Sequence, residues 1–243
     1  MNRDAPPVVI VGGGVAGLAA AIRLCEARVP CVVLEQRARG GGRTTSFRDA
    51  ASGETIDNGQ HLLIAGYART MAYLDTIGAR PLVSVQETPS LLFHHPARGF
   101  LPLVLPPLPS PLHLVAGVLA SPLLPLRDRL SFLGAGLDLW RLDPEVDDEL
   151  AAMTVEEWLE SVGESAEARN AFWRPLAVAV MNEHPATAAA VPFVHAVRET
   201  FLRRRGNAAA VLPRVGLSEL FVHPAVRYLH GRGGGREIGR AHV

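Results

Sequence analysis

Three glycines near the start of the chain have the spacing of a dinucleotide-binding turn. Gly12, Gly14 and Gly17 follow the β-branched run 8–11 and open the Ala- and Leu-rich stretch 15–27. In such a turn the first glycine allows a sharp change of direction, and the second lets backbone amides approach a pyrophosphate. The third lets the helix pack on the strand. The motif predicts dinucleotide binding, and the alternative is a glycine-rich turn without a ligand.

An acidic residue ends the strand that is expected after this helix. Glu35 follows the apolar run 31–34 and stands 23 residues after Gly12. A carboxylate at this position accepts hydrogen bonds from ribose hydroxyls. The order strand, turn, helix, strand predicts a βαβ unit within the first 35 residues. We therefore expect a Rossmann-like, doubly wound α/β domain.

A second cluster of glycine and arginine begins four residues after this strand. The members that we expect at the cofactor are Arg39, Gly41, Gly42 and Arg43. A guanidinium group is a forked donor that matches phosphate oxygens, and glycines permit close approach of the backbone. A nicotinamide-binding fold does not need this element, so the expected cofactor is FAD. The alternative is a solvated arginine loop.

The third motif, residues 57–61, reads Asp-Asn-Gly-Gln-His. We expect Gly59 beside the cofactor. His61, or Asp57 if it is protonated, could donate a proton to a leaving group. The alternatives are a structural histidine and a turn-capping carboxylate. No catalytic residue is assigned from the sequence.

Together, these motifs resemble the flavoprotein amine oxidase and phytoene desaturase superfamily. The form Asp-Asn-Gly-Gln-His is similar to the hydroxysqualene dehydroxylase family, also called squalene-associated FAD-dependent desaturases, of bacterial hopanoid synthesis. Segments 109–114, 172–176 and 212–221 agree with this family. The resemblance implies reduction of hydroxysqualene to squalene, with reduced FAD supplying the hydride. It also implies an isoprenoid substrate and other squalene-pathway enzymes as partners.

Three other functions stay open. The first is a carotenoid desaturase or an amine oxidase on the same scaffold, which the motif at 57–61 disfavours. The second is a prenyl-binding module without flavin, which the second glycine cluster disfavours. The third is an inactive fragment, because the resemblance implies further sheet strands and a C-terminal glycine-acid segment beyond the similar region.

Composition narrows the function classes. The chain has 243 residues, of which 48% are hydrophobic and 20% charged, which is typical of a globular protein. Its 24 basic residues are all arginine and balance 24 acidic residues, so nucleic acid is not an expected partner. The lack of lysine excludes P-loop and Schiff-base chemistry. Cys25 and Cys31 match neither a metal-ligand pattern nor a disulfide framework, so we expect no metal and a cytoplasmic location.

The segment 99–126 is apolar. Its 28 residues include no charge and seven prolines. That length would cross a bilayer, but prolines disfavour one continuous helix. We expect a lid or substrate-domain segment that docks peripherally on the inner face of the cytoplasmic membrane. Ordinary core and true insertion are the alternatives.

Four helices are expected: at 67–77, at 154–161 behind a capping box, at 166–181 with an interruption at Pro175, and at 217–229. The predicted organisation has four parts. The parts are a first FAD-binding segment at 1–65, a substrate domain, mainly helical, at 66–200, a return segment at 201–236 and a tail at 237–243.

Residues 237–243 are interpreted as a tail that does not belong to the natural protein. A turn is expected at the glycines of 231–235, and no strand is expected after it. The codons GAG ATC GGA AGA GCA CAC GTC, which spell a common sequencing adapter, encode residues 237–243. We expect this tail to be adapter read-through, the natural protein to continue further, and the chain as printed to be inactive.

Overall fold

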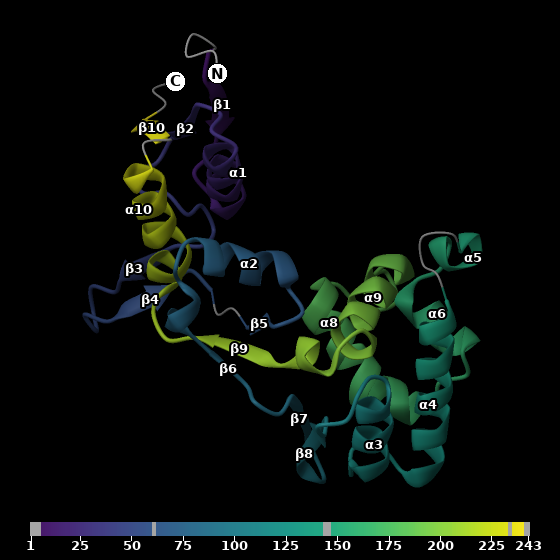
Figure 1. Cartoon of the computed structure of the whole chain (residues 1–243). Helices are drawn as coiled ribbons and strands as arrows, with labels where there is room; N and C mark the ends of the chain where they lie inside the picture. The colour runs from purple at the N-terminus through teal and green to yellow at the C-terminus, as the bar shows by residue number, and fades with distance from the viewer. Residues whose placement is uncertain (1–5, 60–61, 143–146, 233–234, 241–243) are drawn as a thin grey trace. The chain divides into compact units, whose positions relative to one another are not determined.

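The chain divides into two compact units, whose elements Figure 1 labels. The computed structural model describes residues 6–59, 62–142, 147–232 and 235–240, the last range by its backbone. The candidate His61 lies outside these residues. Unit 1 comprises residues 1–63, 67–84 and 211–243, and unit 2 comprises 64–66 and 85–210.

Unit 1 begins with the predicted βαβ arrangement. Strand β1 (Val8–Val11) pairs in parallel with β2 (Cys31–Glu35), and helix α1 (Val15–Glu26) connects them. The apolar positions of α1 recur at helical spacing and are the ones that are buried. Together with the helical composition of unit 2, this confirms the predicted fold class, an α/β domain with an inserted, mainly helical part.

A third strand corrects the expectation for the C-terminal residues. Strand β10 (Gly235–Arg240) pairs in parallel with β2, on the edge opposite β1. The prediction that no strand follows the glycines was therefore wrong. The open edge of β2 presents backbone donors and acceptors, and an extended segment that reaches this edge satisfies them whatever its side chains are.

The rest of unit 1 surrounds this βαβ core. It consists of the hairpin β3 (Ser46–Arg48) and β4 (Thr55–Asp57), helix α2 (Ala68–Thr76), the turn η1 (Arg80–Leu82), the π-turn η5 (Ser218–Val222) and helix α10 (His223–Gly231). Helix α10 packs against α1. The chain passes between the units within three short strands that form one sheet in the order β5 (Leu63–Ile64), β9 (Ala210–Pro213), β6 (Val83–Val85).

The division between the units differs from the predicted boundaries at 66 and 200. Helix α2 belongs to unit 1, where the buried Tyr73 hydroxyl donates to the Phe221 carbonyl oxygen at 2.8 Å. The return to unit 1 comes at residue 211, because Phe201 and Ala208 are buried in the core of unit 2. Both differences depend on contacts between residues far apart in the sequence.

Unit 2 consists of one hairpin and a set of helices around an aromatic core. These elements are β7 (Ser90–His95), β8 (Gly99–Val104), α3 (Leu112–Ala120), α4 (Leu126–Arg141), α5 (Asp148–Ala151), α6 (Val155–Ser161), α7 (Ala166–Ala168), η2 (Arg169–Trp173), α8 (Arg174–Met181), α9 (Ala190–Val197), η3 (Arg198–Leu202) and η4 (Arg205–Ala208). Phe132 stacks on Trp173, whose ring meets the edges of Trp158 and Phe172. These rings hold the helices together.

Two local predictions for unit 2 can be compared with its helices. The capping box at α6 is confirmed, because Thr154 and Glu157 exchange hydrogen bonds between side chain and backbone. The interruption expected at Pro175 lies just before it, in the π-turn η2, and Pro175 occupies the first turn of α8. Proline lacks an amide hydrogen and its ring crowds the carbonyl four residues earlier, so the preceding turn widens.

The apolar segment 99–126 forms strand β8, a proline-rich loop and helix α3. Leu103, Leu105 and Val118 from this segment lie in the core of unit 2. Among the described residues, none of the helices is long and apolar enough to cross a membrane.

Candidate functional site

The turn between β1 and α1 has the geometry that its glycines predict. Gly12 has φ +104°, and its amide donates to the Leu34 carbonyl oxygen at 2.7 Å. A Cβ on Gly17 would lie 2.0 Å from the carbonyl oxygen of Gly12. The backbone itself therefore requires glycine at both positions.

Gly14 differs from these two glycines, because the fold leaves room for a side chain there. Its φ of −71° suits any residue, and a Cβ would have the Gly41 carbonyl oxygen, 4.0 Å away, as its nearest described neighbour. That side chain would project into an open cavity. Gly14 is also the N-cap of α1, and no described side chain caps this helix. The first turn of α1 therefore presents backbone amides and a positive dipole end toward the cavity.

The second glycine cluster lies directly beside this turn. The Gly41 amide donates to the Gly13 carbonyl oxygen at 2.7 Å, and Gly14 and Gly41 form a parallel bridge. Gly41 and Gly42 have φ values of +110° and +59°, which disfavour other residues. The two loops thus form one backbone cradle.

An open cavity of about 570 Å³ lies against the cradle. Its lining combines the end of α1 with the second loop: Gly14, Val15, Ala16, Arg37, Gly41, Gly42, Arg43, Thr44, Thr45 and Asn58. Two of these described residues are arginines and none is a carboxylate. Free amides, hydroxyls and guanidinium groups are the donor set that a pyrophosphate needs.

The lining can be compared with the residues expected from the sequence. Gly14, Gly41, Gly42 and Arg43 line the cavity, whereas Arg39 and Gly59 are exposed and do not. Sequence analysis did not assign Arg37, Thr44, Thr45 or Asn58. The sequence offered a signal for two of these residues. Arg37 stands two residues after Glu35, and Asn58 lies inside the third motif.

Glu35 links the turn after β1 to the start of the second loop through hydrogen bonds. Its carboxylate accepts from the amide of Gly13 at 2.8 Å and from the amide of Arg37 at 2.9 Å. Hydrogen bonds from the backbone of Arg37 and then of Gly13 lower the pKa of Glu35, so the carboxylate stays ionised at neutral pH. Each oxygen keeps a further lone pair for a ribose hydroxyl.

The candidate Asp57 has structural partners. Its Oδ1 accepts from the Ser46 hydroxyl at 2.6 Å and from the Leu217 amide at 2.9 Å. The Ser218 hydroxyl accepts from the Ser46 amide, and the Ser218 amide donates to Ser46 Oγ. A Cβ on Gly216 would lie 2.7 Å from Ser46 Oγ. Asp57 therefore fastens the hairpin β3–β4 to the return segment.

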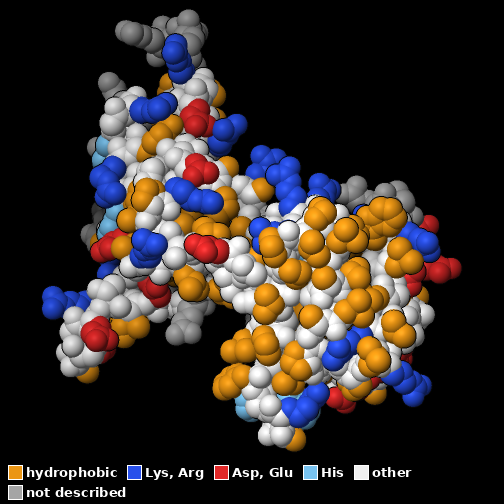
Figure 2. Space-filling view, turned by 60° about the horizontal axis from the view of Figure 1, so that its bottom comes forward, with side chains coloured by type: hydrophobic (Ala, Val, Ile, Leu, Met, Phe, Trp, Pro, Cys, Tyr) orange, Lys and Arg blue, Asp and Glu red, His pale blue; other side chains and the backbone are white. Residues whose placement is uncertain are grey.

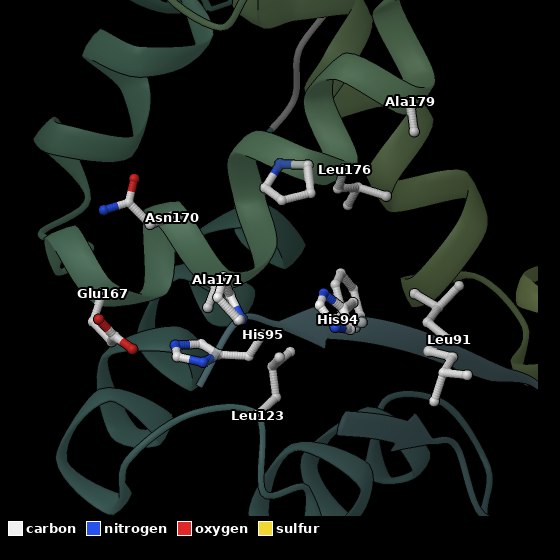
Figure 3. A pocket seen from close by; sticks show the side chains of 13 residues that line it. Leu91, His94, His95, Leu123, Glu167, Asn170, Ala171, Leu176 and Ala179 are labelled. Atoms are coloured by element: carbon white, nitrogen blue, oxygen red, sulfur yellow. The ribbon is translucent and has the colours of Figure 1, made fainter. Parts of the chain in front are cut away.

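Unit 2 has a cavity of its own, of about 520 Å³ (Figure 3). Apolar residues from β7, η2, α8 and two loops form most of its walls: Leu91, Leu92, Phe93, Pro96, Leu123, Ala171, Pro175, Leu176 and Ala179. Four polar residues also line it: His94, His95, Glu167 and Asn170. The His95 Nδ1 accepts from the Ala97 amide at 3.1 Å, and the His94 ring packs edge-on with Phe100. Glu167 lies 3.7 Å from the Arg98 guanidinium, and the Asn170 Oδ1 accepts from Arg174. The walls of this cavity are thus mostly apolar, with two histidines among its polar residues.

Comparisons with known proteins agree with this chemistry. The family model for flavin-containing amine oxidoreductases matches residues 15–222. This chain belongs to that family. The cofactor of the family is FAD, and the open space at Gly14 and the donors around it fit a dinucleotide pyrophosphate.

Individual members of the family are similar along most of the chain. Hydroxysqualene dehydroxylases of Rhodopseudomonas palustris and Sinorhizobium fredii are 32% and 30% identical, over 96% and 93% of this chain and 52% and 51% of their own length. The chain thus spans about half the length of the curated relatives it matches. An oxidoreductase structure from Methanosarcina mazei matches with a TM-score of 0.66 at 14% identity, over 95% of this chain and 50% of that one, which supports the fold.

Proposed function

We propose that this chain provides the cofactor-binding loops of an FAD-dependent enzyme that reduces hydroxysqualene to squalene in hopanoid biosynthesis. The observation that carries the proposal is the similarity to hydroxysqualene dehydroxylases along 96% of the chain, which includes the whole backbone cradle. The apolar cavity of unit 2 supports an isoprenoid as the substrate.

In this proposal the residues of unit 1 have distinct tasks. Gly14 and the first amides of α1 bind the pyrophosphate, while Arg37 and Arg43 neutralise its charge. Gly12 and Gly17 shape the turn, and Glu35 accepts from the ribose. Gly41 and Gly42 hold the second loop against the first. Arg39 and Gly59, which stand outside the cavity lining, are the expected cofactor contacts with the least support.

The reaction itself asks little of the protein side chains. Reduced FAD, when bound, supplies the hydride that forms the new carbon–hydrogen bond. The carbon–oxygen bond breaks and the hydroxyl leaves as water, which requires one proton from a donor. Asp57 is engaged by Ser46 and Leu217, so in this proposal the donor is His61, which lies outside the described residues.

The experiment that tests this function compares the product of the complete reading frame with the printed chain. Each is purified, scanned through the flavin absorbance bands, and incubated anaerobically with hydroxysqualene and a chemical reductant. For the product of the complete reading frame we expect bound flavin, and squalene detected by gas chromatography with mass spectrometry; for the printed chain we expect little flavin and no squalene. Flavin with conversion of phytoene but not of hydroxysqualene would contradict the substrate. A folded protein without flavin would contradict the enzyme and favour a prenyl-binding module.

A further inference from the structure

Helix α4 has two apolar faces, although a surface helix needs only one. Over its 16 residues, the face toward the core of unit 2 consists of Phe132, Ala135 and Leu139, which are all buried. That face is sufficient to hold α4 on the unit. The second apolar face therefore needs another explanation.

This second face forms a narrow stripe on the surface. Leu126, Leu130, Leu137 and Trp140 expose 69%, 65%, 45% and 59% of their surface. At about 100° per residue these four positions fall within an arc of roughly 80°. The arc lies on the side of the helix opposite Phe132 and Ala135. We call Leu126, Leu130, Leu137 and Trp140 the α4 stripe.

Charged residues are ordered around the α4 stripe. On the same helical wheel the residues that border it, Arg129 on one side and Arg141 on the other, are both basic, whereas Asp128 and Asp138 lie further round. The Arg129 guanidinium donates to the carbonyl oxygens of Leu124 and Leu119, at 2.9 Å and 2.5 Å, which fixes its position beside the stripe. Such an order is complementary to an anionic surface with an apolar interior.

Elements that pack near α4 also expose apolar residues. Helix α3 packs against α4 and exposes Leu112 and Leu119, and β8, which packs against α3, exposes Phe100. Figure 2 shows hydrophobic side chains, with arginines among them, over much of the face of unit 2 that is turned to the viewer. Isolated apolar residues on a surface are ordinary, whereas several on neighbouring elements are typical of a binding face.

We infer that the α4 stripe docks unit 2 on a membrane that contains anionic lipids. Leucines would enter the region between headgroups and acyl chains, Trp140 would lie at the headgroup level, and Arg129 and Arg141 would meet lipid phosphates. A protein partner would not require arginine on both borders of the stripe. The inference concerns unit 2 alone and does not depend on the proposed reaction.

The tryptophans of the chain allow a direct test. All three, Trp140, Trp158 and Trp173, lie in unit 2, and the latter two are each 2% exposed. A blue shift of the fluorescence on adding vesicles therefore reports Trp140. The test uses vesicles of phosphatidylethanolamine and phosphatidylglycerol in equal parts, with sedimentation as a second measurement. We expect the protein to sediment with the vesicles and its emission to shift, and Trp140→Phe to remove the shift while binding persists.

The decisive variant replaces two leucines of the stripe. Leu130→Glu with Leu137→Glu should lower the vesicle partition coefficient at least about tenfold, because burial of two leucines is replaced by burial of charge. The matched control, Val178→Glu with Val180→Glu, adds the same charge at exposed valines of α8 and should bind as the wild type does. Circular dichroism confirms that each variant is folded. Point changes are preferable to deleting 99–126, because that segment supplies core residues.

Three results would overturn the inference. The first is wild-type protein that stays in the supernatant at low salt. The second is equal binding by the stripe variant and the control. The third is a stripe variant that splits an oligomer on size-exclusion chromatography, which would make the stripe a protein interface. Vesicles of phosphatidylcholine alone should bind more weakly than anionic vesicles, and equal binding would refute the role of the arginines.

Discussion

At the scale of single residues, Gly14 and Gly17 belong to the same sequence motif, but glycine is needed at the two positions for different physical reasons. Gly17→Ala would place a Cβ 2.0 Å from the Gly12 carbonyl oxygen, whereas Gly14→Ala meets no described atom closer than 4.0 Å. We therefore expect Gly14→Ala to fold normally and to lose at least about tenfold in FAD affinity, because its methyl group fills the pyrophosphate space. Gly17→Ala should destabilise unit 1 itself, by about 1–3 kcal/mol or more.

This pair separates binding from folding. FAD affinity is measured by quenching of flavin fluorescence, and folding by far-ultraviolet circular dichroism during thermal unfolding. Suppose that Gly14→Ala lowered the melting temperature as much as Gly17→Ala does. Glycine at position 14 would then be required for folding, and not for binding of a ligand.

A second prediction concerns Glu164, a carboxyl buried in unit 2. Burial raises the pKa of Glu164 to about 7, and the charge of Asp128 adds to the rise. The folded state thus holds a proton that the unfolded state, with a pKa near 4.5, releases. The contribution of Glu164 to the free energy of unfolding should be highest below pH 4.5, fall by about 1–3 kcal/mol as the pH rises to 7, and level off above it.

The variant Glu164→Gln isolates this contribution. It cannot ionise, so the difference in unfolding free energy between variant and wild type should change in favour of the variant between pH 4.5 and 7. Urea unfolding followed by tryptophan fluorescence measures it, since every tryptophan lies in unit 2. A difference that is independent of pH would show that Glu164 is ionised in the folded protein.

At the scale of elements, the capping box of helix α6 is a local sequence signal whose contribution to stability can be measured. Thr154 Oγ1 accepts from the Glu157 amide, and the Glu157 carboxylate accepts from the Thr154 amide at 2.8 Å. Thr154→Ala leaves the first turn of α6 without its cap, and we expect a loss of about 1 kcal/mol in the unfolding free energy of unit 2. Thr154→Ser, which keeps the hydroxyl, is the control. Equal losses in both variants would mean that the methyl group, and not the cap, matters.

The hairpin β3–β4 depends on a long-range fastening through Asp57. Asp57→Ala removes the acceptor of two hydrogen bonds and should destabilise unit 1 by about 1–3 kcal/mol, while Asp57→Asn keeps an oxygen at that position. We expect the asparagine variant to retain flavin and most of its turnover. Complete loss of turnover with flavin retained would instead identify Asp57 as the proton donor.

These elements also show how far the sequence predicts the site. Glycine spacing and a run of β-branched residues are local signals, and they identify β1, α1, β2 and the two loops. The partner of Asp57 is not local, because Leu217 stands 160 residues later. Arg37 and Asn58 line the cavity because their loops fold back on α1. The spacing of residues in the sequence does not predict how these loops fold.

At the scale of the whole molecule, two structural results could not be read from the sequence. Strand β10 forms through the backbone edge of β2, so its side chains gave no strand pattern. Helix α2 joins unit 1 through Tyr73 and Phe221, although it directly follows the segment at which the substrate domain was expected to begin. In both cases long-range pairing, and not local propensity, determines the arrangement.

The discontinuity of unit 1 has a consequence for synthesis on the ribosome. Apart from residues 64–66, unit 2 is one continuous stretch, whereas the hairpin β3–β4 waits for Leu217 and Ser218 before its anchoring bonds can form. Since chains emerge from the N-terminus onward, unit 2 can fold while the nucleotide-binding loops, made first, are still unanchored. The oldest part of the nascent chain is thus among the last to mature.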